Sequence, residues 1–321
     1  PPPPPPPLQA EAGIRDCTRS LVGSEMCIRD RFKLDTTDSV RLLISVVSSF
    51  DRNDHLSAVQ KLVQRVEDSQ LHRLEDDHQR HWDDYWAKSR IQLSDKFVEN
   101  VWYFNVYQMG ASYSPKFSGG LAGPFFSEEP PPWQNDLHEV NETFRFYSVH
   151  AANHPELGDG FVETYWRMIP HVREFTKQFY GFDGLRFPHA CGYSGAEREA
   201  LPVAFRFLYM QCASGLIANI AWWQYEFTQD RDDLRERIYP IVKGAAEFYT
   251  NYMTRDEDGK SHIYPSFSPE QKPTLWCRDA TIDLAMARHT LRAAIQASEI
   301  LDVDRESRAI WKDRLDNVAP Y

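Results

Sequence analysis

A short loop flanked by prolines offers a candidate for acid–base chemistry. Residues 265–270 read Pro-Ser-Phe-Ser-Pro-Glu. The two prolines restrict the backbone, so the sequence predicts a rigid loop that presents Glu270 at its tip. A carboxyl group held on a loop among aromatic residues can have a raised pKa and act as a general acid. The same residues also fit an ordinary surface turn that carries an exposed glutamate.

A second group of polar residues opens a predicted helix after a long loop. The stretch WQNDLHEVN contains Trp133, Asp136, His138, Glu139 and Asn141. Side chains of these types can bind sugar hydroxyls or orient a water molecule, and flat Trp rings pack against the CH faces of sugars. In the alternative interpretation Asp136 and Asn141 cap the helix and Trp133 belongs to the core.

Four further positions are candidates for sugar binding. His189 lies in a loop, and Trp222 lies late in an apolar helical stretch. A lone loop histidine is more often structural, and an aromatic residue at helical spacing more often belongs to a core. Trp276 and Arg278 follow the proline-flanked loop. No spacing in the chain suits a zinc or calcium site, and there is neither a phosphate-binding glycine loop nor a GxSxG motif.

Composition narrows the class of protein. The chain has 321 residues, of which 42% are hydrophobic, and this is enough for a large core. The net charge of -11 argues against nucleic acid or an anionic membrane surface as partner. No apolar run reaches the roughly 20 residues of a membrane-spanning helix. The five cysteines are scattered, so we expect neither a disulfide framework nor a zinc ribbon.

The first 31 residues do not look like part of a fold. Seven prolines precede a stretch without helical or strand periodicity, and no apolar run marks a signal peptide. The string TRSLVGSEMCIRDR resembles a translated sequencing adapter. We therefore expect residues 1–31 to be non-native and disordered, and the native N-terminus to be missing. The cellular location then stays open, with an extracytoplasmic one favoured.

Periodicity predicts a mainly helical chain. Residues 39–49 are apolar and β-branched and predict one or two strands, and apolar residues at helical spacing begin at Ser57. Residues 113–138 are rich in Gly, Ser and Pro and predict a loop. Further helices are predicted over residues 96–110, 142–152, 161–180, 203–228, 233–253, 281–302 and 305–317. This pattern is typical of helical hairpins.

Taken together and in this order, the motifs resemble glycoside hydrolase family 95, the α-L-fucosidases, and more broadly the six-hairpin (α/α)6 glycosidases. The resemblance covers about residues 36–321. It is carried by His81-Trp82 with Trp86, Ser89-Arg90-Ile91, the loop from Trp133 to Asn141, Asn153 with Glu156-Leu157, the helix end from Trp222 to Asp230, Tyr239-Pro240, Pro265 to Glu270, Thr281-Ile282-Asp283-Leu284 and Ala319-Pro320-Tyr321.

The resemblance implies a domain organisation. Residues 32–54 would be a remnant of an N-terminal β-supersandwich, residues 55–90 a helical linker, and residues 91–321 part of an (α/α)6 catalytic barrel that is truncated at its C-terminus. The implied fold is therefore mainly α, an incomplete (α/α)6 toroid. An incomplete toroid leaves apolar helix faces uncovered, so we expect the chain to aggregate.

The resemblance also implies a mechanism. The family inverts configuration with two carboxyl groups, and Glu270 matches its general acid. Two asparagines that orient the water in the family fall on Glu139 and Asn141, so the first position departs from the pattern. The family's Asn-Tyr-Trp is Arg145-Phe146-Tyr147 here, a second departure. The base aspartate lies beyond Tyr321 in the family, so we expect this chain by itself to be inactive.

An oligosaccharide or glycan is the implied substrate, and no cofactor is implied. In this interpretation the sugar would pack on Trp133, Trp222 and Trp276, and hydrogen bonds would come from Asp136, His138, His189 and Arg278. One alternative is a non-catalytic carbohydrate-binding protein on the same fold, which the departure at Glu139 favours. Another is a phosphorylase or lyase on the same barrel. The sugar, its linkage and the oligomeric state do not follow from these residues.

Overall fold

The structure is a computed structural model of the chain. It describes residues 44–48, 51–64, 68–112, 114–120, 137–195, 205–268 and 276–321, with side chains not described at residues 63–71, 138–139 and 205–206. The chain divides into two compact units, Pro1–Gln79 and Arg80–Tyr321. No helix within the described ranges is both long enough and apolar enough to cross a membrane.

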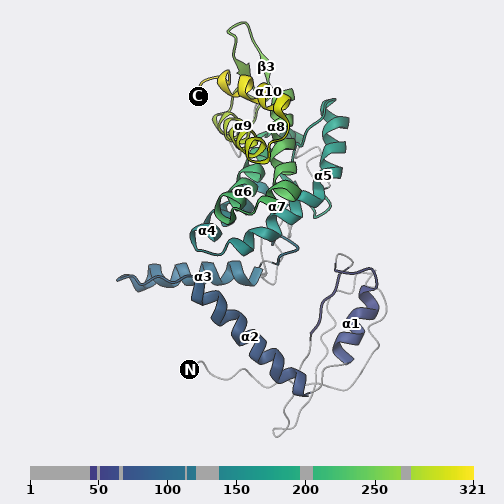
Figure 1. Ribbon diagram of the computed structural model, residues 1–321, viewed down its shortest axis with the longest axis vertical. Coiled ribbons are helices and arrows are strands. Elements are labelled where there is room, and N and C mark those ends of the chain that lie inside the picture. The colour runs from purple at the N-terminus through teal and green to yellow at the C-terminus, as the bar shows by residue number, and fades with distance from the viewer. Residues whose placement is uncertain are drawn as a thin grey trace. The chain divides into compact units, whose positions relative to one another are not determined.

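The first unit contains α1 (His55–Gln64) and the first part of α2 (Asp68–Lys88), which agree with the helical pattern predicted from Ser57 onward (Figure 1). The strand prediction for residues 39–49 is wrong where it can be followed. Residues 44–48 form neither strand nor helix. Residues 39–43 and 49 lie outside the described part.

The second unit is built mainly from helices, as the periodicity predicts. Two small antiparallel ladders accompany them, β1 with β2 and β3 with β4. The elements are the end of α2, α3 (Lys96–Ser112), β1 (Leu137–His138), α4 (Glu139–Ala151), η1 (Pro155–Leu157), α5 (Gly158–Tyr180), β2 (Ala190–Cys191), η2 (Phe205–Tyr209), α6 (Cys212–Thr228), α7 (Arg231–Asp233), the π-helical η3 (Leu234–Ile238), α8 (Tyr239–Tyr252), β3 (Thr254–Arg255), β4 (Ser261–His262), α9 (Thr281–Leu301) and α10 (Arg305–Asp316).

Local chemistry explains several helix ends. α5 ends where Gly181 adopts a left-handed conformation with φ of 82°, which glycine accepts without steric strain. The side chain of Asp230 accepts hydrogen bonds from the N–H groups of Asp232 and Asp233 and so caps α7. Pro240 occupies the first turn of α8, directly after the π-helical η3, and its fixed φ is compatible with the helix.

Helices α6 and α9 run parallel, side by side. Near their starts the N–H of Cys212 donates to Asp283, and near their ends Arg231 donates to the carbonyl of Ile300. The start of α6 is thus next to the start of α9, and the end of α6 is next to the end of α9.

Helix α4 runs parallel to α6 on the other side. The side chain of Asn219 in α6 donates to the Tyr147 hydroxyl in α4 at 3.5 Å. One turn further, His150 Nε2 lies 2.8 Å from Gln224 Oε1. Because both helices advance together, the starts of α4, α6 and α9 lie at one common end.

Helices α5 and α8 return in the opposite direction. Tyr180 at the end of α5 donates to the carbonyl of Leu208, just before α6 begins. Tyr249 near the end of α8 donates to Gln211 O at 2.7 Å, at the same place. The chain therefore alternates between a parallel set and a returning set, which is the helical-hairpin arrangement predicted from the sequence (Figure 1).

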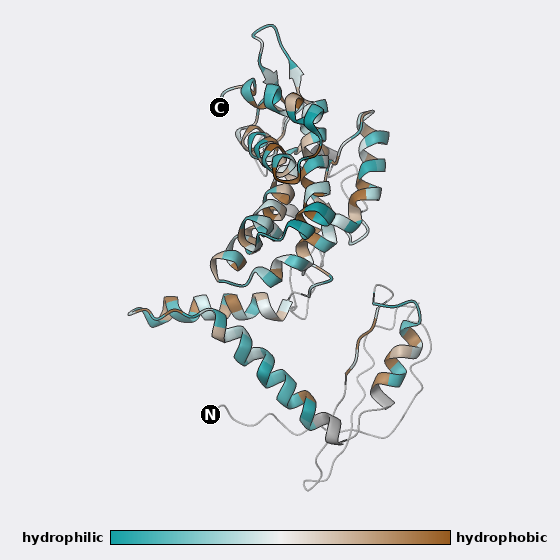
Figure 2. Ribbon diagram, in the orientation of Figure 1, coloured by the Kyte–Doolittle hydropathy of each residue, from teal (hydrophilic) through white to brown (hydrophobic). Residues whose placement is uncertain are grey.

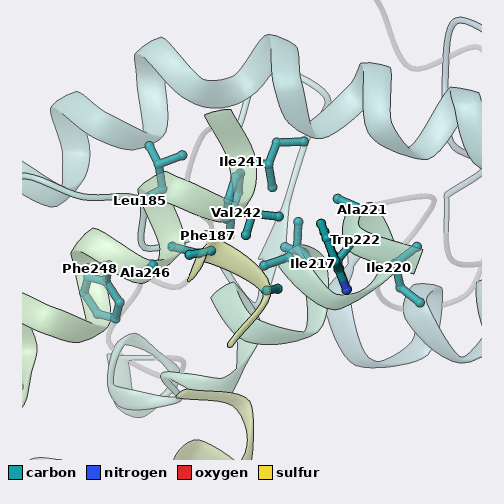
Figure 3. Close-up of a cluster of buried hydrophobic side chains, with 14 of the residues drawn as sticks. Leu185, Phe187, Ile217, Ile220, Ala221, Trp222, Ile241, Val242, Ala246 and Phe248 are labelled. Atoms are coloured by element: carbon teal, nitrogen blue, oxygen red, sulfur yellow. The ribbon is translucent and has the colours of Figure 1, made fainter. Parts of the chain in front are cut away.

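The core lies between these two sets of helices. Figure 3 shows side chains of α6 (Ile217, Ile220, Ala221) facing those of α8 (Ile241, Val242, Ala246), with Leu185 and Phe187 beside them. All eight side chains are fully buried. This packed interior fixes the parallel helices, and with them the end at which their N-termini meet.

Helix α3 contains several hydrophobic residues (Figure 2), and their large side chains are exposed in the described part of the chain. They are Phe97, Val98, Val101, Phe104 and Tyr107, with exposed fractions between 41% and 77%. Aggregation of the chain stays a prediction, which light scattering would test.

Gly215 allows the close approach of α6 and α9. A Cβ at this position would overlap the Cβ of Met286 and would lie 2.9 Å from Tyr249 Oη. We expect Gly215→Ala to lower the free energy of unfolding by about 1–3 kcal/mol, because the helices must move apart. Urea denaturation measures this loss. Gly192→Ala is the control, since no atom lies within 4 Å of its Cβ position, and an equally stable Gly215→Ala variant would contradict the packing.

Candidate active site

The starts of the three parallel helices are held together by a small apolar cluster. Met210, Cys212, Leu216 and Phe267 form its buried centre. Val140 in the first turn of α4 and Ile282 in the first turn of α9 pack against it, with Phe207, Tyr209 and Met286. Phe267 belongs to the proline-flanked loop, so this cluster brings that loop to the helix N-termini. The positive ends of three helix dipoles favour negative charge at this end.

The β1–β2 ladder brings two predicted site segments together. His138 pairs with Ala190 and Leu137 pairs with Cys191, so the residues before Glu139 lie beside those after His189. The imidazole of His189 stacks on Phe207 at a centroid distance of 4.6 Å, and Phe207 contacts Phe267 edge-on at 5.8 Å. His189 therefore lies close to the base of the Glu270 loop.

The Glu270 loop is closed at its base. Ser266 N–H donates to Cys277 O at 2.9 Å, and Cys277 N–H donates to Ser266 O at 2.8 Å. Next to this bridge, the Tyr252 hydroxyl donates to Pro265 O at 2.6 Å. Glu270 itself lies outside the described residues, four positions after Ser266. Four residues span at most about 14 Å, so the bridge restricts the region that Glu270 can reach.

Asp283 is a buried carboxylate at the centre of this end. It accepts hydrogen bonds from Cys212 N–H at 2.7 Å and from the Ser266 hydroxyl at 2.5 Å. Ser266 Oγ in turn accepts from Ala280 N–H at 3.1 Å. Burial raises the pKa of Asp283 to about 7, although the hydrogen bonds from Ser266 and Cys212 oppose this rise. From the sequence, Asp283 stands out only as part of a family motif. Its position between the apolar residues Ile282 and Leu284 at a predicted helix start is the signal that could have indicated a structural role.

A second buried carboxylate, Glu142, lies in the first turn of α4. It accepts hydrogen bonds from the hydroxyls of Ser118 and Tyr165, the latter at 2.7 Å. In the next turn Arg145 donates to Gly119 O at 2.9 Å and to Gly120 O at 2.7 Å. These bonds fasten the segment before residues 121–136 to α4. Glu142 was not singled out from the sequence, and Arg145, one of the departures from the family pattern, has a structural role.

The remaining predicted site residues fall into different places. Asn141 is exposed in the first turn of α4, and Trp276 is 48% exposed with its ring 4.8 Å from that of Tyr209. Both are accessible at the end where the helices start. Trp133 and Asp136 lie outside the described residues, as do the side chains of His138 and Glu139.

Trp222 belongs to the core, not to this end of the molecule. It is 4% exposed and packs on Tyr225, and Figure 3 shows it among the buried side chains. It follows Cys212 by ten residues, which is about 15 Å along the helix. The structure therefore does not support its expected role as a sugar platform, because the apolar spacing reflects packing between α6 and its neighbours.

Arg278 lies beside the hairpin of β3 and β4. Its guanidinium donates to Asp256 and, at 3.4 Å, to Asp279. In the same group the His262 ring bonds Asp279 at 2.5 Å and Asp258 at 3.0 Å. These ion pairs occupy Arg278, so its expected hydrogen bond to sugar gains no support. The described residues contain no group of three or more His, Cys, Asp or Glu side chains placed to hold a metal ion.

The described helices form a helical-hairpin protein, and comparison with known proteins gives the family. Residues 50–321 match the glycosyl hydrolase family 95 catalytic domain. The chain belongs to this family, which confirms the resemblance found in its motifs.

Similar proteins agree with this family in fold and name. A kojibiose hydrolase of Flavobacterium johnsoniae is 25% identical over 74% of this chain and 34% of its own length. The alpha-L-fucosidase 2 of Arabidopsis thaliana is 22% identical over 64% of this chain and 25% of its own length. A solved structure from the human microbiome, described as a kojibiose phosphorylase, shares the fold with a TM-score of 0.65 and 15% identity, over 84% of this chain and 40% of that one. The chain thus spans about a third or less of the curated relatives, and the mainly helical six-hairpin prediction is confirmed.

Two titrating groups at this end give the stability a pH dependence. The ordinary pKa of an aspartate is about 3.9, so between about pH 4 and 7 folded Asp283 keeps a proton that the unfolded chain has lost. The hydrogen bond to Asp279 raises the pKa of His262, whose contribution is present below its ordinary pKa and is lost as pH rises through the folded value. Both effects lower the free energy of unfolding as pH rises.

We therefore expect the melting temperature to fall between about pH 5 and pH 8. Asp283→Asn carries no charge at any pH and should flatten this slope. A pKa difference of about three units between the folded and unfolded chain changes the free energy of unfolding by at most about 4 kcal/mol. Exposed Asp302→Asn at the end of α9 serves as the control and should keep the slope. Thermal denaturation over this range measures it, and a variant slope equal to that of the wild type would contradict the assignment.

Proposed function

We propose that this chain is the part of an inverting glycoside hydrolase that carries the general acid, Glu270. One observation supports the proposal above the others: Phe267 of the Glu270 loop and Val140 at the start of α4 pack in a single cluster. The acid segment and the Glu139–Asn141 segment then border the same space at the helix N-termini. Membership of glycosyl hydrolase family 95 adds an independent reason.

The proposed reaction is a single displacement. Glu270 gives its proton to the glycosidic oxygen as the bond to the leaving sugar breaks, and a water molecule attacks the anomeric carbon from the opposite face. Asn141, with Glu139, orients that water. Its proton passes to a base, which we assign to an aspartate outside this chain. Glu139 places a carboxylate where the family pattern has an amide. This difference would change either the group that acts as base or the sugar that the site accepts, relative to the family.

The proposed substrate class is an α-linked oligosaccharide. The relatives are named for kojibiose and for fucosides, so a terminal glucose or fucose unit is the sugar to test. The half-exposed Trp276 ring offers a flat apolar surface on which a sugar face can pack, and His189 lies near the loop base as a possible hydrogen-bonding partner. Oligosaccharide is thus the partner that the site supports.

The test uses the full product of the gene that encodes this chain, with the 321-residue chain assayed beside it. We expect Glu270→Gln to lower kcat on kojibiose or a fucosyl oligosaccharide by about 10²–10⁴-fold, with little change in KM, because the leaving oxygen loses its proton donor. A glycosyl fluoride, whose leaving group needs less protonation, should lose much less rate. Steady-state kinetics on both substrates measure this difference.

Glu257→Gln, an exposed glutamate between β3 and β4, is the matched control and should keep full activity. Full activity of Glu270→Gln, or equal losses on both substrates, would contradict the assignment of the acid. Full hydrolysis by the 321-residue chain would contradict the assignment of the base to a residue outside it. Sugar binding without hydrolysis by the gene product would favour the non-catalytic alternative.

A further inference from the structure

Asp283 joins two segments that are far apart in the sequence. Its Oδ1 accepts from Cys212 N–H at the start of α6, and its Oδ2 accepts from the Ser266 hydroxyl at the base of the Glu270 loop. Backbone N–H groups of Gln211 and Phe267 add to the same environment. The carboxylate therefore takes donors both from the loop and from the helix against which the loop packs.

We propose that Asp283 is a positioning residue for the general acid: through Ser266 it holds the base of the Glu270 loop on the N-terminus of α6. This inference rests on the proposed function only in taking Glu270 as the acid. Asp283 does not touch the substrate in this account. It acts on the reaction by holding Ser266 and, through the backbone bridge, Cys277.

The contacts around Ser266 form a continuous chain of hydrogen bonds. Its hydroxyl donates to Asp283 and accepts from Ala280 N–H, while its backbone forms the two-bond bridge with Cys277. Both ends of the Glu270 segment are thus connected to one carboxylate, one end directly and the other through the bridge. Ser266 and Asp283 are both completely buried, so solvent cannot replace a lost partner.

Neighbouring groups explain why a carboxylate is tolerated at this buried position. Cys212 N–H is one of the donors that a helix start leaves unpaired, and the α6 dipole favours a negative charge there. Burial raises the pKa of the Tyr249 hydroxyl in α8, the charge of nearby Asp283 adds to this rise, and the charge of Arg186 opposes it. Arg186 is a fully buried cation beside the same tyrosine. These donors and charges stabilise the ionised form that Asp283 takes as the pH rises through about 7.

The test measures, in the 321-residue chain, how stable the hydrogen bonds at the loop base are. Hydrogen exchange at the Ser266 and Cys277 amides reports the bridge, because each N–H is a donor in it. Ser266→Ala removes the contact to Asp283 with a minimal change in volume, and we expect both amides to exchange at least about tenfold faster. Ser266→Thr keeps the hydroxyl and should restore exchange to within about threefold of the wild type.

Ser298→Ala is the matched control. Ser298 is also completely buried in α9 and donates to Ile295 O at 3.0 Å, so its loss should lower stability without changing exchange at Ser266 and Cys277. Asp283→Ala approaches the contact from the other side. If Asp283 acts through Ser266, the double variant Ser266→Ala with Asp283→Ala exchanges no faster at the bridge than Asp283→Ala alone. If Asp283→Ala does not fold, the pair Ser266→Ala and Ser266→Thr decides.

The proposal and the function on which it rests fail in different ways. Unchanged exchange at the bridge in folded Ser266→Ala, or an equal change in Ser298→Ala, would overturn the positioning role whatever the activity. In the hydrolysis assay of the gene product, Ser266→Ala should lower kcat more than it raises KM, and an unchanged kcat would also overturn the role. If Ser266→Ala loosens the bridge but the wild-type protein hydrolyses no glycoside, the proposed function is contradicted and the control of the loop base by Asp283 stays supported.

Discussion

A carboxylate removed from water must be surrounded by donors, and the organisation of this end of the molecule depends on that constraint. Asp283 meets it with the Ser266 hydroxyl and the first N–H of α6. Both donors are available only if the starts of α6 and α9 lie side by side. The parallel packing of these helices, the close approach at Gly215 and the closed loop base are therefore parts of one arrangement.

The same principle recurs at the start of α4. Glu142 is buried and accepts from the hydroxyls of Ser118 and Tyr165, which fastens the segment before residues 121–136. Each of the two loops in which we place sugar contacts is thus connected to a buried carboxylate in the first turn of a parallel helix. In the proposed site, rigid helices carry the loops, and the loops would supply the side chains that meet the substrate.

Local patterns in the sequence predicted most of the fold and only part of the site. The helices follow from apolar spacing, and the loop at Pro265 follows from proline and serine chemistry, because both signals lie within a few residues. The roles of Asp283 and Glu142 depend on partners up to 71 positions away, and no local pattern contains those pairings. Trp222 and Trp276 look alike as residue types, and only packing separates the core residue from the accessible one. Residues 44–48 have strand-like composition but form no strand, and composition by itself does not show whether another segment will pair with them.

The most direct test of this account is a crystal structure of the chain with kojibiose or a fucosyl oligosaccharide bound. The account predicts a sugar at the N-terminal ends of α4, α6 and α9, with one face against Trp276. The carboxyl of Glu270 would then lie about 2.6–3.2 Å from the glycosidic oxygen. A sugar bound away from these helix starts, or a Glu270 side chain directed away from the bound sugar, would contradict it.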